Sequence, residues 1–100
     1  MIAVDLDGTL AEYHGWQGEE HIGKPIPLMM ARVKNWIAQG RTVAIFTARA
    51  NDESAIPYVK EWLEKQGLPP LEVTNIKRKE FKEIWDDRAI RVICNTGRIL

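Results

Sequence analysis

The chain has 100 residues, of which 45% are hydrophobic and 28% are charged, and its formal net charge is zero. This length and composition are typical of one globular domain, residues 1–100, with a single hydrophobic core. The neutral balance gives no indication of nucleic acid or an acidic membrane surface as a partner, and no apolar run is long enough to span a bilayer.

The first ten residues predict a buried strand that ends in two carboxylates. Ile2, Ala3 and Val4 form an apolar run typical of a parallel strand covered on both faces. Residues two apart in an extended chain point the same way, so Asp5 and Asp7 can face one cleft. Two such carboxylates repel each other unless a cation lies between them, and Mg²⁺ is a hard ion that prefers oxygen ligands. A solvated turn after an ordinary strand is the alternative.

The segment Asp5-Leu6-Asp7-Gly8-Thr9 resembles D-x-D-G-T, the first motif of the haloacid dehalogenase (HAD)-like phosphohydrolase superfamily. The resemblance implies an α/β fold, a Rossmann-like three-layer sandwich with a mainly parallel sheet and the first strand central. It also implies that Asp5 is the nucleophile and Asp7 the general acid/base. Main-chain N–H groups at Leu6 and Asp7 would hold phosphoryl oxygens.

Residues 11–24 predict a loop or small hairpin, because they contain three glycines and lack any periodicity. In the resembled superfamily a flap or an inserted cap domain occupies this position, and this segment is long enough only for a flap. We therefore expect no cap domain. His14, Trp16 and His21 are candidates for substrate contact. The alternative is that Trp16 anchors the loop and the histidines are solvated.

A helix and a second strand follow the loop. The helix is expected to end at Gly40 and to place its Met and Trp stripe in the core, since the apolar residues repeat at helical spacing: Met29, Met30, Val33, Trp36 and Ile37. Residues 43–46 are a second buried strand. A right-handed crossover between the two strands makes them parallel, which places the end of the second strand beside the aspartates.

Thr47 closes this second strand, at the edge of the sheet where ligands bind in open α/β folds. Its hydroxyl and the following N–H groups, including that of Ala48, suit a phosphate oxygen. The position resembles the second superfamily motif, a Thr or Ser that ends an apolar strand. Arg49 is a candidate for contact with phosphate or leaving group, and a structural salt bridge is the alternative.

A second helix, with Trp62 on its apolar face, is expected to end at Gly67. Residues 71–75 predict a short third strand. The resemblance implies a lysine after it that neutralises the nucleophile and the phosphoryl group. Lys77 is preferred because it follows the strand end directly, and Lys79 and Lys82 remain alternatives. About ten residues separate this strand from the next carboxylates, so we expect a turn there rather than a helix.

Asp86 and Asp87 follow a short apolar segment and resemble the fourth superfamily motif, which completes the metal site. The resemblance implies a Mg²⁺ cofactor held by Asp5, by the main-chain carbonyl of Asp7 and by Asp87. Asp86 would not contact the ion directly: it would either support Asp87 from outside the ligand set or bind the ion through a water molecule.

The last part of the chain predicts a fifth strand over residues 90–94, a turn at 95–97 and a tail that folds back as a hairpin. Cys94 is the only cysteine and therefore forms no internal disulfide. We expect it to fill space in the core. We expect a cytoplasmic protein, because a single thiol fits a reducing compartment and the strand predicted at residues 2–4 leaves no room for a signal peptide.

Together these features predict a Mg²⁺-dependent phosphatase. Asp5 would attack phosphorus and form an aspartyl-phosphate, while Asp7 would protonate the leaving oxygen and then activate water. A site without a cap admits a small phosphorylated molecule or a polymer end, and a homo-oligomer could cover it. One alternative is a regulatory phospho-acceptor such as a response-regulator receiver, whose aspartates come in the reverse order. Another is a binding module that has lost activity.

Overall fold

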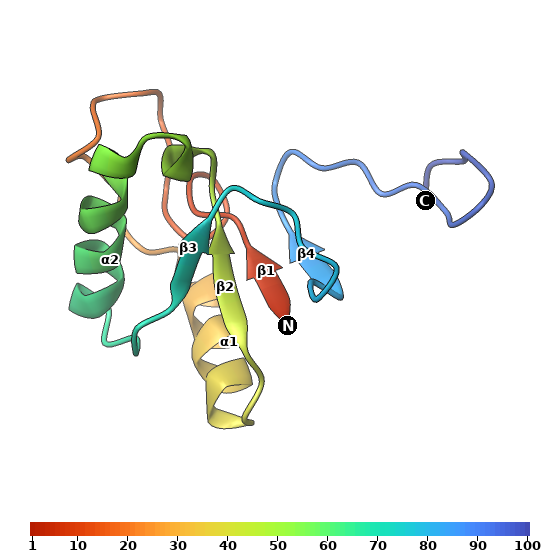
Figure 1. The fold of residues 1–100 in the computed structure, drawn as a ribbon, viewed down its shortest axis with the longest axis horizontal. Coiled ribbons are helices and arrows are strands. Elements are labelled where there is room, and N and C mark those ends of the chain that lie inside the picture. The colour runs from red at the N-terminus through yellow and green to blue at the C-terminus, as the bar shows by residue number, and fades with distance from the viewer.

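The sheet has four strands, all parallel, in the order β3-β2-β1-β4 (Figure 1). The computed structural model describes residues 1–100. Its strands and helices are β1 (Ile2–Val4), α1 (Pro27–Ala38), β2 (Val43–Phe46), α2 (Ile56–Lys65), β3 (Glu72–Thr74) and β4 (Glu83–Trp85). The predicted α/β class, the interior position of β1 and the absence of a cap are confirmed. Neither helix has the length and hydropathy needed to cross a membrane.

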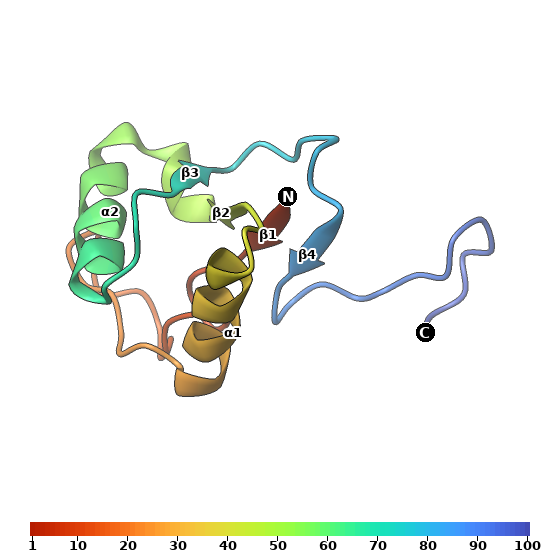
Figure 2. The same ribbon diagram turned by 90° about the horizontal axis from the view of Figure 1, so that it is seen from below.

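Both helices cover the same face of the sheet (Figure 2). The chain steps from β1 to β2 to β3 in one direction, and right-handed crossovers in one direction place their helices on one side. Alternate strand residues point to this face, so one cluster joins sheet and helices. The cluster contains Ile2, Val4, Leu6, Leu10, Ala11, Met29, Met30, Val33, Trp36, Val43, Ile45, Val59, Trp62, Leu63 and Leu68. The Met and Trp stripe of α1 is therefore core, as predicted.

The opposite face of the sheet has a thin cover. The link from β3 to β4, residues 75–82, returns past β2 and β1 without forming a helix. Phe81 is buried there against Ala3 and Ala44, whose small side chains leave room for its ring. The expected third layer is thus reduced to this link, because the segment is too short for a helical crossover.

The helix ends follow local signals in the sequence. Pro27 begins α1, where a missing N–H costs no hydrogen bond. The Thr47 side chain caps a 3₁₀ turn, Ala48–Asn51, by accepting from the Arg49 N–H at 3.1 Å. After a second 3₁₀ turn, Glu53–Ala55, α2 runs to Lys65. Gly67 follows it with a φ of 79°, the left-handed conformation that ends many helices.

Residues 88–100 extend away from the body of the molecule (Figure 1). The predicted fifth strand over 90–94 is absent, and this prediction is wrong. The tail does fold back as a small hairpin, as predicted: the Ile93 N–H donates to the Arg98 carbonyl, and Val92 bridges Ile99. The apolar segment has no neighbouring strand to join, so the hairpin stays outside the sheet. Cys94 is exposed, so its predicted place in the core is also wrong.

Candidate active site

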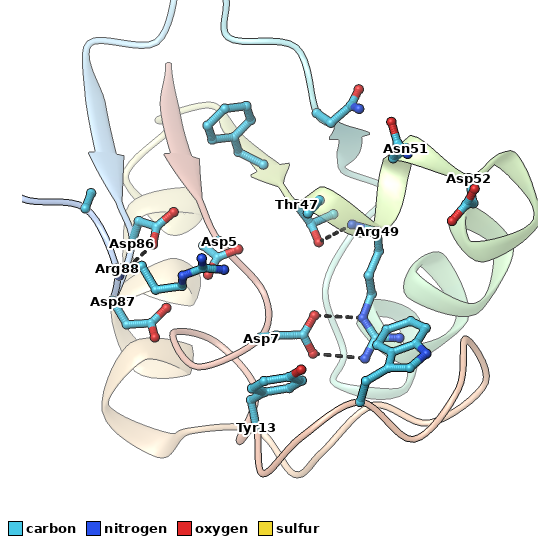
Figure 3. A pocket seen from close by; sticks show the side chains of 15 residues that line it. Asp5, Asp7, Tyr13, Thr47, Arg49, Asn51, Asp52, Asp86, Asp87 and Arg88 are labelled. Carbon is cyan, nitrogen blue, oxygen red and sulfur yellow. Dashed lines mark hydrogen bonds and ion pairs between the residues drawn. The ribbon is translucent and has the colours of Figure 1, made fainter.

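The ends of β1, β2 and β4 meet at one edge of the sheet, around an open cavity of about 840 Å³ (Figure 3). Parallel strands bring their carboxyl ends to the same edge, and β1 is flanked by β2 and β4. The structure therefore brings together the residues that the sequence predicted from three separate segments. The cavity is lined by Asp5, Asp7, Tyr13, Trp16, Phe46, Thr47, Ala48, Arg49, Asn51, Asp52, Asn75, Asp86, Asp87, Arg88 and Ala89.

Three carboxylates converge at the end of β1. Asp5, Asp86 and Asp87 each offer an oxygen, and the three oxygens lie within 4.8 Å of one another. The register explains this, since Val4 pairs with Trp85 and the next residues, Asp5 and Asp86, leave adjacent strands side by side. This is a set of hard oxygen donors of the kind that holds Mg²⁺. The donor chemistry fits the predicted ion.

The carboxyl group of Asp5 has a strongly perturbed pKa. Burial, the charge of Asp86 and a hydrogen bond with Asp87 raise the pKa of Asp5 from 3.8 to about 7, while the Leu6 N–H acts in the opposite direction. The neighbours of Asp5 are therefore mostly negative. A divalent cation among the three carboxylates would favour the ionised form of Asp5, which is the form that acts as a nucleophile.

Thr9 joins two of these carboxylates and was missed as a site residue. Its Oγ1 donates to the Asp87 Oδ1 at 3.0 Å and accepts from the Asp87 N–H at 3.0 Å. Asp5 Oδ2 lies 3.4 Å from the same hydroxyl oxygen. Thr9 is buried, so this contact between the turn after β1 and the end of β4 is shielded from water. The signal was present, because Thr9 is the last residue of the D-x-D-G-T segment.

Gly8 allows this close approach of the two segments. Its φ is 87°, and a Cβ at this position would lie 2.6 Å from the Asp87 Oδ2. Any side chain would therefore strain the turn and displace Asp87. The positive φ and the short distance to Asp87 both favour glycine at this position.

Asp7 does not join the carboxylate cluster with its side chain. The Arg49 Nε donates to its Oδ2 at 2.7 Å and the Arg49 Nη2 to its Oδ1 at 2.9 Å (Figure 3). This is the bidentate geometry of a strong ion pair. Arg49 therefore forms a salt bridge in this structure, which was the alternative to phosphate contact. Its partner, Asp7, is the residue predicted to be the general acid/base.

Arg49 also holds the flap-like loop in place. Its guanidinium donates to the carbonyls of Glu19 at 3.1 Å and His21 at 2.8 Å, and lies 4.8 Å from the centre of the Trp16 ring. Arg49 is only 7% exposed, although it is a charged residue near an open cavity. One buried side chain thus connects Asp7, the loop and the end of β2.

The three aromatic candidates of the loop have different positions. Trp16 lines the cavity and packs on Arg49, so it both anchors the loop and faces the site. His14 is exposed, lies 3.5 Å from Glu12 and is not among the cavity residues. His21 contributes its carbonyl but its ring does not line the cavity.

Two of the residues predicted to bind phosphate, Thr47 and Ala48, lie at the end of β2. Thr47 is buried and lines the cavity, and its Oγ1 already accepts from Arg49, which leaves the hydroxyl hydrogen for an oxygen in the cavity. Ala48 lines the cavity beside it. The Leu6 side chain is in the core, and its N–H contacts the Asp5 carboxylate.

No lysine lines the cavity. Lys77 is exposed, and Lys79 and Lys82 are exposed as well, because the link from β3 crosses the open face of the sheet. The structure therefore does not support the preference for Lys77. Arg88 lines the cavity instead and has no salt-bridge partner, while its N–H donates to the Asp86 Oδ1 at 2.8 Å.

Seven further lining residues were not predicted as site residues: Tyr13, Phe46, Asn51, Asp52, Asn75, Arg88 and Ala89. Arg88 and Asn75 could have been noticed, since Arg88 directly follows a predicted motif and Asn75 is the last residue of the predicted third strand. The others depend on how the loops fold.

Comparison with known proteins leaves the family open. No family model matches the chain, and no curated protein matches it. A solved structure of a conserved protein from Bacteroides thetaiotaomicron is similar, with a TM-score of 0.69 and 24% sequence identity. The similarity covers 88% of this chain and 75% of that one. At this identity the likeness shows the α/β fold and carries nothing about function.

Proposed function

We propose that this chain is a Mg²⁺-dependent phosphatase of the HAD-like type, which hydrolyses a phosphomonoester through an aspartyl-phosphate on Asp5. The observation that carries the proposal is the convergence of Asp5, Asp86 and Asp87 beside Asp7 and Thr47 at one edge of the sheet. Acidic groups at this edge, with a hydroxyl on the adjacent strand, suit a phosphoryl group bound with its cation.

Mg²⁺ at Asp5, Asp86 and Asp87 would offset the repulsion between a carboxylate nucleophile and a phosphate dianion. The chain supplies the other contacts. The Thr47 hydroxyl and the Ala48 N–H would bind phosphoryl oxygens. Arg88, the cation that lines the cavity without an acidic partner, would take the neutralising role that the sequence assigned to Lys77.

The reaction would proceed in two balanced steps. An Asp5 oxygen attacks phosphorus, the bond from phosphorus to the leaving oxygen breaks, and Asp7 gives that oxygen a proton. A water molecule then attacks phosphorus, Asp7 takes a proton from it, and the bond to Asp5 breaks to release phosphate. Because both Asp7 oxygens accept from Arg49, this ion pair has to open or shift for Asp7 to reach the substrate.

The test is phosphate release from a panel of phosphomonoesters, with Mg²⁺ and with a chelator. We expect metal-dependent release by the wild-type chain and a loss of at least about a thousandfold in Asp5→Asn, since the nucleophile is removed. Glu64→Gln is the matched control, because it makes the same change on the exposed surface of α2. Release that persists in Asp5→Asn would contradict the proposal.

A second candidate function, a regulatory phospho-acceptor, is favoured by one observation. In this structure Arg49 engages both oxygens of the residue that would activate water. A phosphoryl group on Asp5 would then persist. The lifetime of the phosphoenzyme distinguishes the two functions: rapid hydrolysis supports the phosphatase, and a phosphoenzyme stable for minutes supports the acceptor.

A further inference from the structure

The C-terminal arm, residues 90–100, is an apolar segment without a cover. Five of its side chains are between 40% and 77% exposed: Ile90, Val92, Ile93, Ile99 and Leu100. The two ribbon views agree that the arm projects away from the sheet and helices (Figures 1 and 2). So many large apolar side chains on one short exposed segment indicate a contact surface.

The arm also differs in charge from the rest of the molecule. It contains Arg91 and Arg98 and no acidic residue, whereas residues 1–89 contain fourteen acidic and twelve basic residues. The arm therefore has a formal net charge of +2 and residues 1–89 one of −2. A second copy of the same chain would offer a body of complementary charge.

The path of the chain keeps the arm away from its own sheet. The Asp87 N–H is held by Thr9, and the Arg88 N–H by the Asp86 carboxylate, so the segment before the arm is fixed at the cavity. The arm leaves from this fixed point, outward from β4. It forms only its own small hairpin, through the bridge between Val92 and Ile99.

Strand β4 offers the place where such an arm could pack. It pairs with β1 on one side and with no strand on the other. Ile84 of β4 is 39% exposed, next to the thinly covered face of the sheet. An unpaired edge is a template for another strand, and residues 90–94 have the β-branched composition of one.

We propose that two copies of this chain exchange arms, each arm packing along β4 of the other copy. The exchange covers the apolar residues of the arm and the free edge of β4 together. It brings a basic segment onto an acidic body, and it leaves the residues of the cavity in place. A single-stranded nucleic acid would use the arginines of the arm but would leave its five apolar side chains exposed, so a second copy fits better.

The first experiment measures the mass of the full chain in solution over a dilution series. The wild type is expected to be a dimer. Val92→Glu/Ile99→Glu should weaken association by at least about tenfold, since each substitution brings a charge into an apolar contact. Leu28→Glu/Tyr58→Glu is the matched control, because both residues are exposed and lie on helices at the opposite face, and it should remain dimeric.

The second experiment locates the contact. Cys94 is the only cysteine and lies in the arm. Wild-type chain is mixed with a tagged Ile84→Cys/Cys94→Ser chain and oxidised, and a disulfide between the two chains is expected. Tyr58→Cys/Cys94→Ser, with its thiol on α2, should form none.

A monomeric wild type, or a dimer that Val92→Glu/Ile99→Glu does not weaken, would overturn the proposal. An arm-dependent dimer without the disulfide from Cys94 to the thiol at position 84 would overturn the assignment to β4. A monomer that binds a single-stranded oligonucleotide through the arm would replace it with a nucleic-acid contact. Far-UV circular dichroism of each variant reports whether the body is still folded.

Discussion

At the scale of single residues, the site is defined by an imbalance of charge. Asp5, Asp86 and Asp87 lie together, while the one buried basic side chain, Arg49, pairs with Asp7. Without a bound ion, repulsion among these three carboxylates destabilises the folded protein. Burial of Asp5 and this repulsion together raise its pKa, and the repulsion makes the cluster suitable for a divalent cation.

The pH dependence of stability follows from Asp5. Its pKa is about 7 in the folded chain against 3.8 ordinarily, so the folded state binds this proton more tightly than the unfolded state. Proton binding by Asp5 therefore stabilises the folded chain. This stabilisation is fully present below pH 3.8 and is lost as the pH rises to about 7. We expect Asp5→Asn to be more stable than the metal-free wild type at pH 8 and similar at acidic pH. Because Asp5 is only partly buried, solvent screening reduces the difference to about 2 kcal/mol, roughly half of what the full pKa shift would give.

Urea unfolding in the presence of a chelator measures this difference. Adding Mg²⁺ should stabilise the wild type and leave Asp5→Asn nearly unchanged, since the variant lacks one ligand. If the two proteins differ by the same amount at both pH values, the account of Asp5 is wrong.

The ion pair of Asp7 with Arg49 makes a second prediction. Both partners are largely shielded, with side-chain exposures of 20% and 5%, and the pair is bidentate. A double-mutant cycle with Asp7→Asn and Arg49→Met should give a coupling free energy of about 2 kcal/mol. The exposed Lys65–Glu61 pair, at 3.1 Å, is the control and should give about 0.5 kcal/mol or less. Equal coupling for the two pairs would contradict the structural role of Arg49.

At the scale of elements, the sequence predicted those parts that depend on local pattern. The apolar runs at 2–4 and 43–46, the stripe on α1 and the place of Thr47 each follow from residues close in the chain. The convergence of Asp5 with Asp86 followed from parallel strand ends meeting at one edge. Thr9 and Arg88 lie in or beside predicted motifs and could have been noticed, but their contacts depend on which segments become neighbours.

Two differences between the expectations and the structure have a common cause. Residues 90–94 have the composition of a strand, but no strand in this chain lies beside them. Lys77 follows β3 directly, but the link without a helix carries it over the open face of the sheet and away from the cavity. Both outcomes are set by the path of the chain rather than by local pattern.

The turn after β1 gives a prediction at this scale. Gly8→Ala should reduce the affinity for Mg²⁺ by about tenfold or more, because the added methyl group displaces Asp87. Gly15→Ala is the control, since its φ is 110° and no atom lies within 4 Å of the added Cβ. Both variants carry the cost of a side chain at positive φ, about 1 kcal/mol, but only Gly8→Ala should weaken binding in a calorimetric titration. Equal affinities in the two variants would show that Asp87 is not a ligand.

At the scale of the whole molecule, the sheet is covered unequally. The face under α1 and α2 holds the main core, and the other face has Phe81 and a short link. The cavity opens at the end of the sheet without a cap, so its contents are exposed to solvent or to a second molecule. The arm beyond β4 is the remaining apolar surface, and arm exchange would place it against the unpaired edge.

If Asp5 accepts a phosphoryl group, as proposed, the position of that group on the chain can be measured directly. The wild type and Asp7→Asn would be mixed with a phosphomonoester and Mg²⁺, quenched in acid and mapped by mass spectrometry. The account predicts phosphorylation of Asp5 in both, with more accumulation in Asp7→Asn because its hydrolysis is slowed. Turnover with no phosphorylated Asp5 in either protein, or with the phosphoryl group on another residue, would contradict it.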